Sequence, residues 1–308
     1  MEYELYHDES KEHGYWHGIL LVPTSTKPML TKYLIKIRKV LAYNTSLSLK
    51  QIKNKGKSFK CAEAWVLFAY AALMQRIKKD GFPTIKLPEL ERGQLRFGNY
   101  SDLIGNYIIG CKFIVLRDRD LFNEMYDTLD FGAKMEITFR MAVKGGIHLL
   151  GSDEKPIEIK KMYFDGHKHY GRNINNDRIK AGLNKLRKYC EISDDLMVYD
   201  DKSDHDKNTT HSYEDCQILQ LTDLLIGSAR VVNGYYGQGG DSRLRIQKEI
   251  ASPVKELLKK YNKGIARMKN SRWSDAICIG ECFLENGEWQ FAKLERKQKK
   301  KQLNLWCW

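Results

Sequence analysis

Acidic residues are missing from a long stretch near the N-terminus of this 308-residue chain. Between His13 and Ala62 there is no aspartate or glutamate, whereas the same segment carries ten lysines and arginines. The whole chain holds 52 basic and 39 acidic residues, a formal net charge of +13. A basic surplus concentrated in one segment favours a polyanionic partner, nucleic acid in particular.

The densest part of that segment is KQIKNKGKSFK, residues 50–60. Clustered lysines neutralise phosphates and make affinity depend steeply on salt. We therefore predict nucleic-acid binding through five side chains: Lys50, Lys53, Lys55, Lys57 and Lys60. A solvated loop without function is the open alternative, and for the lysine-rich tail at 293–301 it is the preferred interpretation.

Cysteine spacing of the metal and redox motifs is also lacking, because no two of the seven cysteines form a Cys-x-x-Cys pair. Their number is odd and the first residues do not resemble a signal peptide, so we expect free thiols in a reducing cytoplasm. Long apolar runs are absent too. The longest, AWVLFAYAALM at 64–74, is too short to span a bilayer and is typical of a buried helix, so no membrane association is expected.

Apolar spacing predicts an α/β fold. We expect strands at 3–8, 15–22, 46–53, 112–118, 157–165 and 196–200, and helices at 27–42, 58–81, 120–145, 175–190 and 212–232. The first two strands form a hairpin, and the continuous apolar run of the fourth strand indicates a central, parallel position. Antiparallel strands followed by strand–helix alternation predict a mixed sheet flanked by helices.

Three parts of the chain are expected from this pattern. Residues 1–232 form one core, and residues 82–110 form an irregular insertion in it, punctuated by glycine and proline. Residues 233–308 form a C-terminal appendage with a glycine-rich loop, a helix, a hairpin turned at Asn286-Gly287 and a basic tail.

Three aspartates occupy positions that secondary structure alone does not explain. Asp8 ends the first expected strand, Asp165 ends the fifth, and Asp223 lies in the apolar helical stretch ILQLTDLLIG. A buried helix tolerates such a charge only when it is paired, binds a metal or faces a polar cleft. Three carboxylates converging at strand ends would repel one another unless a cation joined them. Oxygen ligands of this kind select Mg²⁺ or Mn²⁺, and two such ions promote phosphodiester cleavage.

Each aspartate alone also has a structural interpretation. Asp8 would cap a turn, Asp165 precedes the turn residue Gly166, and Asp223 would pair with Arg230 or with a lysine across the core. Together with the basic segment, the three residues favour metal chemistry.

Two motifs, YHDES at 6–10 and QLTDLLIG at 220–227, resemble those of the bacterial family called domain of unknown function 3800. The family pattern is an N-terminal Asp-Glu-Ser and a late Gln-Leu-Ala-Asp-Leu-Leu-Ala-Gly, and here Thr222 and Ile226 replace the two alanines. The segment YDDKS at 199–203 also fits the family, and the resemblance spans about residues 3–232. It implies a ribonuclease H-like fold and a metal-dependent nuclease.

The resemblance also implies roles for single residues. Asp8, Asp165 and Asp223 would be the ligands, with Glu9 and Gln220 in support. One departure is that the family often has an acid on the third strand, whereas the expected strand at 46–53 has none. Either Glu63, in the first turn of the next helix, supplies a fourth carboxylate, or the site is impaired. Asp118, which ends the fourth strand, is a rival to Asp165.

The sequence therefore predicts a nuclease that uses two Mg²⁺ or Mn²⁺ ions on DNA or RNA. Asp8 would bridge both ions, and Asp165 and Asp223 would each bind one. The loop HDKNTTHS at 205–212 is expected near the site, where His205 or His211 would assist proton transfer. Two alternatives stay open: a nucleic-acid-binding protein with a degenerate site that does not cleave, and a protein that docks to a partner or to its own copy through residues 233–308.

Overall fold

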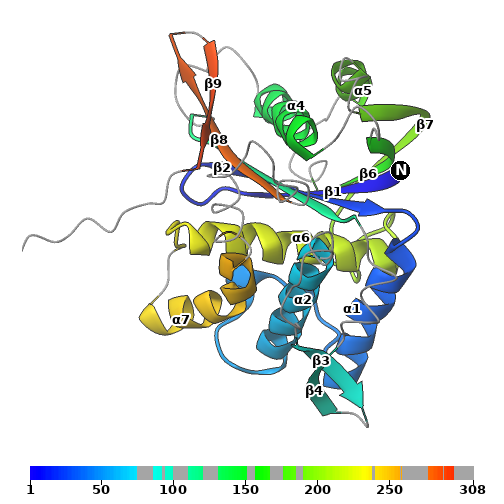
Figure 1. Cartoon of the computed structure of the whole chain (residues 1–308), viewed down its shortest axis with the longest axis vertical. Helices are drawn as coiled ribbons and strands as arrows, with labels where there is room; N and C mark the ends of the chain where they lie inside the picture. Colours follow the sequence, from blue (N-terminus) through cyan, green and yellow to red (C-terminus); the bar gives the residue numbers. More distant parts are fainter. Residues whose placement is uncertain are drawn as a thin grey trace, which may run out of the picture.

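The computed structural model describes residues 1–74, 86–91, 94–99, 110–120, 131–150, 157–166, 176–184, 190–237, 240–256, 258, 277–286 and 288–294. Seven strands form one sheet in the order β7-β6-β1-β2-β5-β8-β9. Figure 1 shows this sheet between two layers of helices. The predicted α/β fold, a mixed sheet flanked by helices, is confirmed.

The centre of the sheet is the predicted N-terminal hairpin. Strand β1 (Glu2–Ser10) pairs antiparallel with β2 (Tyr15–Pro23), and β5 (Lys112–Asp118) follows antiparallel to β2. On the other side of β1, strands β6 (Ile157–Asp165) and β7 (Cys190–Asp201) are added in parallel. The expected position of β5 is therefore half right, because it lies inside the sheet but is parallel only to β8.

Helices cover both faces of the sheet (Figure 1). On one face lie α1 (Lys27–Leu41), α2 (Lys57–Met74), α6 (Tyr213–Val232) and α7 (Asp241–Ile250), and on the other lie α4 (Phe131–Leu150) and α5 (Asn176–Asn184). Because side chains alternate along a strand, Tyr6 and Val115 pack towards α6 whereas Leu5 and Ile114 pack towards α4. The sheet thus divides the core into two halves. Odd- and even-numbered residues of a regular strand face different halves, and this alternation is called parity below.

The strand expected at 46–53 is wrong. Only Leu49–Gln51 there forms a regular element, one turn of 3-10 helix. The amides of Leu47 and Leu49 donate to side chains of α6, Gln220 and Asp223, so the backbone is satisfied without a neighbouring strand. Leu47, Leu49 and Ile52 are buried in the core next to α6, so the spacing of Leu47 and Leu49 reflects the packing of a loop and not of a strand.

The C-terminal hairpin is confirmed, but it does not belong to a separate appendage. Strand β8 (Ile277–Glu285) turns at Asn286, with φ 53°, into β9 (Glu288–Lys293). β8 pairs in parallel with β5, and Ile250 lies in the same core cluster as α6. The described part of 233–308 therefore extends the main sheet, because β8 needs a paired edge and β5 supplies one. β9 is one of the two edge strands of the described sheet, and a partner docking there stays a prediction.

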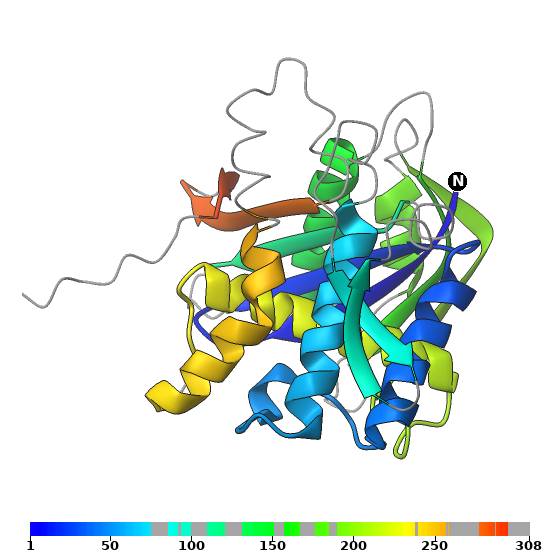
Figure 2. The ribbon, with the colours of Figure 1, turned by 60° about the horizontal axis from the view of Figure 1, so that its bottom comes forward.

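The expected insertion at 82–110 contains a two-stranded hairpin rather than only irregular chain. Strands β3 (Lys86–Glu91) and β4 (Gln94–Asn99) pair antiparallel and lie against α1 and α2, outside the main sheet (Figures 1 and 2). The six described cysteines are free and buried, as predicted, while Cys307 lies outside the described residues. Among the helices that the structure describes, none is long and apolar enough to cross a membrane.

Candidate metal centre

The strand register places Asp8 beside Asp165. The parallel pairing of β1 with β6 aligns His7 with Phe164, so the next residue of each strand is one of these aspartates. Both share the parity of Tyr6 and Tyr163, whose rings stack 4.7 Å apart on the α6 side of the sheet. Asp8 lies within β1 and not in the turn after it, so its interpretation as a turn cap is wrong.

Asp223 reaches the same region from α6. The helix begins after Ser212, whose hydroxyl accepts a hydrogen bond from the Asp215 amide. From Asp215 to Val231 every residue of α6 is buried except Asp223, which is half-buried. Its Oδ2 accepts a hydrogen bond from the Leu49 amide at 3.1 Å, whereas Arg230 contacts Ser10 and Glu12. The alternative in which Asp223 pairs with Arg230 is therefore wrong.

Two glycines let these segments approach closely. Gly18, the β2 partner of Asp8, lies directly under α6, and a Cβ there would be 2.8 Å from the Cβ of Ile226. A Cβ on Gly227 would be 2.7 Å from a methyl of Leu49. Neither glycine has a strained backbone, so the requirement is for space and not for conformation. Because α6 packs this close to Gly18, its residue Asp223 lies near Asp8, the β1 partner of Gly18.

The three aspartates form one electrostatic cluster. Burial raises the pKa of Asp8 well above its ordinary value, and the charges of Asp165 and Asp223 raise it further. Burial also raises the pKa of Asp165, while hydrogen bonds from Ser203 oppose the rise and the charge of Asp223 adds to it. The fold thus gathers all three predicted ligands, and it does so at an electrostatic cost that a cation would offset.

Other buried acids on this side of the sheet already have a cation. The Lys27 ammonium lies 2.5 Å from a Glu4 oxygen and 2.6 Å from an Asp215 oxygen, and the Tyr6 hydroxyl lies 2.7 Å from an oxygen of each carboxylate, so it can donate to either. Burial raises the pKa of Asp215, but hydrogen bonds from Lys27 and Ser212 bring it below its ordinary value. This network joins the start of α1 and the start of α6 to β1, so it is structural.

Ser203 and Gln220 connect the aspartates to the surrounding loops. The amide and hydroxyl of Ser203 donate to the two Asp165 oxygens at 2.6 and 2.9 Å. The Ser203 carbonyl accepts from the Gln220 amide at 2.6 Å, and Gln220 Oε1 accepts from the Leu47 amide and from Arg38. Gln220 therefore binds Ser203, the residue that binds Asp165, and it holds the 47–49 segment, whose Leu49 amide binds Asp223. Sequence reasoning missed Ser203, although it ends the quoted YDDKS segment.

His211 and Asp201 hold the ends of β6 and β7. His211 Nε2 lies 2.8 Å from the Asp201 carbonyl and 3.1 Å from the Phe164 carbonyl, so it can clamp the strand end that carries Asp165. The Asp201 carboxylate accepts from the amides and hydroxyls of Thr209 and Thr210 at 2.6–3.0 Å. It thereby folds the 202–210 loop. Nothing in the sequence pattern predicts this role for Asp201.

Three predicted residues lie apart from the cluster. Glu9 has the opposite parity to Asp8 and lies 3.7 Å from Lys11, although its amide donates to Asp8. Asp118 lies on the α4 side with Cys282, so it is not a rival to Asp165. Glu63 lies near Glu249 and Lys55 and so supplies no fourth carboxylate to the cluster. Along the chain, the third strand of the main sheet is β5 and not 46–53. The lack of an acid at 46–53 therefore says nothing about the third strand, because that segment is not a strand.

The donor chemistry fits a hard divalent cation. All three side chains offer oxygen, and the mutual repulsion of buried Asp8 and half-buried Asp165 is what Mg²⁺ or Mn²⁺ would relieve. In the described part of the chain, however, no group of three or more histidine, cysteine, aspartate or glutamate side chains is already spaced to hold an ion. The cluster is therefore an electrostatic association that would tighten around a cation.

The five predicted phosphate-binding lysines are all exposed. They follow the loop from the 3-10 turn to the start of α2, next to the Leu49 amide that binds Asp223. Lys55 also forms an ion pair with Glu249 at 2.7 Å, which is exposed and therefore weak. The basic surface thus borders the carboxylate cluster.

Comparison of the chain with known proteins gives no relative. No protein-family model matches it, and no curated protein or solved structure matches it either. The resemblance carried by YHDES and QLTDLLIG therefore remains a prediction from the sequence.

Proposed function

We propose that this protein is a divalent-metal-dependent nuclease with a ribonuclease H-like core. The observation that carries the proposal is that Asp8 of β1, Asp165 of β6 and Asp223 of α6 come close enough for their charges to interact, Asp8 and Asp165 through the register of their strands. The strand arrangement supports the fold, since the antiparallel strands β5, β2 and β1 are joined by parallel β6 and β7. The adjoining lysines supply the positive surface that a nucleic acid needs.

The three aspartates would hold Mg²⁺ or Mn²⁺, with Asp8 between the other two. A bound ion would supply an activated water and stabilise the leaving oxygen of a phosphodiester. Ser203 fixes the orientation of Asp165, and Leu49 fixes that of Asp223. Because Asp223 is half-buried, it leaves the cluster open to solvent on the side where a phosphate would enter.

One observation favours a second candidate, a nucleic-acid-binding protein that does not cleave. Both oxygens of Asp165 already accept hydrogen bonds from Ser203. If those bonds persist, Asp165 has fewer lone pairs to offer, and the cluster would serve only as a folded remnant of a metal site.

Asp223→Asn separates the two candidates. An asparagine can keep its oxygen on the Leu49 amide, so the fold should survive, while the charge that holds the ion is lost. Changes in groups that only orient metal ligands cost roughly 10–100-fold in activity, so loss of a ligand should exceed that range. The assay measures Mg²⁺-dependent cleavage of labelled single- and double-stranded DNA and RNA, together with melting temperature with and without Mg²⁺.

The matched control is Asp194→Asn, an exposed position on β7. We expect the wild type and this control to cut and to be stabilised by Mg²⁺, and Asp223→Asn to melt normally and do neither. An Asp223→Asn protein that cuts at the wild-type rate would remove this residue from the site. A wild type that binds all four substrates and cuts none would favour the second candidate.

A further inference from the structure

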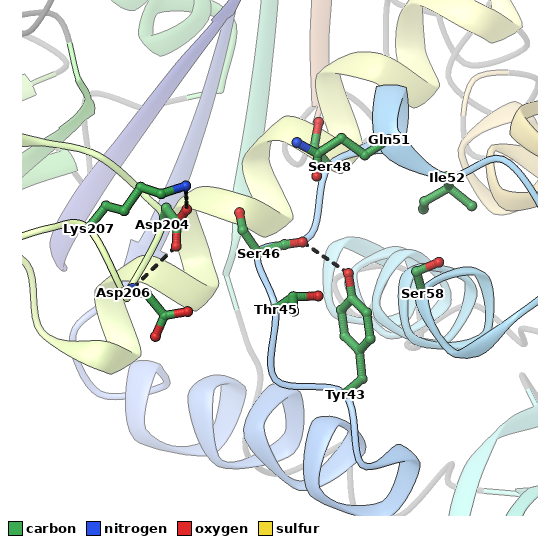
Figure 3. Close-up of a pocket in the computed structure, with 10 residues that line it drawn as sticks. All are labelled: Tyr43, Thr45, Ser46, Ser48, Gln51, Ile52, Ser58, Asp204, Asp206 and Lys207. Carbon is green, nitrogen blue, oxygen red and sulfur yellow. Dashed lines mark hydrogen bonds and ion pairs between the residues drawn. The ribbon is translucent and has the colours of Figure 1, made fainter.

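A polar cavity of about 450 Å³ lies beside the carboxylate cluster. Figure 3 shows Asp204 and Asp206 on one side of it and the 43–52 segment on the other. Its wall carries five hydroxyl groups, from Tyr43, Thr45, Ser46, Ser48 and Ser58. The volume lies within the range of small-molecule sites, roughly 300–1,000 Å³.

The two walls of this cavity are the segments that hold two of the aspartates. Ser48 precedes Leu49, whose amide donates to Asp223. Asp204 follows Ser203, whose amide and hydroxyl donate to Asp165. A molecule in the cavity would therefore contact Ser48 and Asp204, the sequence neighbours of the two residues that bind these aspartates.

The cavity and its surroundings differ in charge. The cavity lining carries two carboxylates, Asp204 and Asp206, and one ammonium, that of Lys207, which lies 2.8 Å from Asp204; Asp206 and Lys207 are themselves exposed to solvent. Outside are the exposed lysines of residues 50–60. Carboxylates repel a phosphate and accept hydrogen bonds from sugar hydroxyls and base amino groups, whereas exposed lysines attract phosphates.

From this division we propose that the cavity binds one unpaired nucleoside of a single-stranded polynucleotide, while the lysines outside hold its phosphates. A base in a duplex is stacked and must be extruded before it can enter such a pocket, so a single strand is the preferred ligand. The proposal rests on the proposed function for the class of ligand. It adds which part of the ligand lies where.

The test is a binding measurement in EDTA, where no metal-dependent cleavage occurs. Fluorescence anisotropy compares a labelled single-stranded oligonucleotide with the same strand made of abasic sugars. We expect the wild type to bind the strand with bases at least about fivefold more tightly, as ordinary base contacts give. Ser58→Phe and Thr45→Trp, which fill the cavity from two different segments, should bring this ratio to about one. Neither should change the affinity for the abasic strand or its salt dependence.

The matched control is Ser252→Phe, an exposed position outside the cavity, which should keep the wild-type ratio. A wild-type ratio of one, no binding of either strand, or tighter binding of the matching duplex would overturn the proposal. A folded filling variant that keeps the wild-type ratio would do the same. If base-dependent binding is found without Mg²⁺-dependent cleavage, the nucleoside pocket stands and the nuclease proposal falls. If Mg²⁺-dependent cleavage is found without base-dependent binding, the nuclease proposal stands and the nucleoside pocket falls.

Discussion

Replacing Asp8 by asparagine should make the metal-free protein more stable at neutral pH, although it removes a proposed metal ligand. Asp8 is buried, and burial together with the charges of Asp165 and Asp223 raises its pKa well above the ordinary value. Each pKa unit of such a rise corresponds to about 1.4 kcal/mol of unfolding free energy lost when the carboxylate is charged. An amide of nearly the same shape carries none of this repulsion.

The opposing loss is small. The Asp8 carboxylate accepts one hydrogen bond, from the Glu9 amide at 2.7 Å, and the asparagine oxygen can accept it too. A neutral acceptor in place of a charged one loses about 1 kcal/mol. We therefore expect the unfolding free energy to rise by about 1–2 kcal/mol, or a melting temperature higher by about 2 °C or more.

The pH dependence has a definite sign. Because the pKa of Asp8 is raised in the folded state, its contribution to stability is present in full below the unfolded pKa of about 3.9 and is lost as pH rises through the folded pKa. The gain from Asp8→Asn should therefore be largest at neutral pH and shrink as the pH falls towards about 4.

The assay is urea denaturation in EDTA across this pH range, with Asp165→Asn as the comparison. Both Asp165 oxygens accept hydrogen bonds from Ser203, so an asparagine there would turn an amide nitrogen towards a donor. The pKa of Asp165 is raised too, so Asp165→Asn also relieves repulsion, but the poorer contact with Ser203 opposes this, and we expect a clearly smaller gain than for Asp8→Asn at neutral pH. An Asp8→Asn protein less stable than the wild type, or a gain that does not change with pH, would refute the reasoning.

Three further predictions test the basic surface and the packing of the site. Alanine at Lys53, Lys55 and Lys57 should lower the slope of log affinity against log salt by up to about 2. The control triple, on helices α4 and α5 across the sheet, replaces Lys144, Arg178 and Lys180 and should leave the slope unchanged; an equal effect of both would remove the 50–60 segment from the binding surface. Gly18→Ala should lower the unfolding free energy by about 1–3 kcal/mol, because its methyl would meet Ile226, and unchanged stability in urea would show that α6 is not packed as described. Gln220→Ala should lower it by about 1–3 kcal/mol because buried partners lose their hydrogen bonds, and Gln217→Ala by less; equal losses would contradict the linking role.

Much of the fold could be predicted because its strongest signals are periodic. The hairpin of β1 and β2, the helix α6 and the strand β6 each have an apolar pattern that follows their burial. Of β7 (Cys190–Asp201) only 196–200 was predicted as strand, and Cys190 was expected to end a helix, because few residues of β7 are buried. The 46–53 segment has the same kind of pattern for another reason, since its amides bind Gln220 and Asp223. A single sequence cannot tell which partner a backbone amide will find.

Part of the candidate site could also be predicted, because two of its aspartates interrupt or end an apolar pattern. A charge inside an apolar helix has few explanations, so Asp223 stood out, and the end of a buried strand marked Asp165. Ser203 and His211 lie in a loop whose composition is ordinary for a loop, and their contacts depend on where β6 and β7 end. Asp118 does not belong to the aspartate cluster because it lies on the α4 side of the sheet, and this follows from the strand order and not from the sequence alone.

The most direct test of the central claim is a crystal of the wild-type protein soaked in Mn²⁺, with an anomalous difference map. The account predicts one or two peaks bounded by Asp8, Asp165 and Asp223, with carboxylate oxygens at roughly 2.0–2.2 Å, and loss of these peaks in Asp223→Asn. Strong Mn²⁺ peaks elsewhere with none among the three aspartates, or a lysine or arginine side chain lying between them, would contradict it.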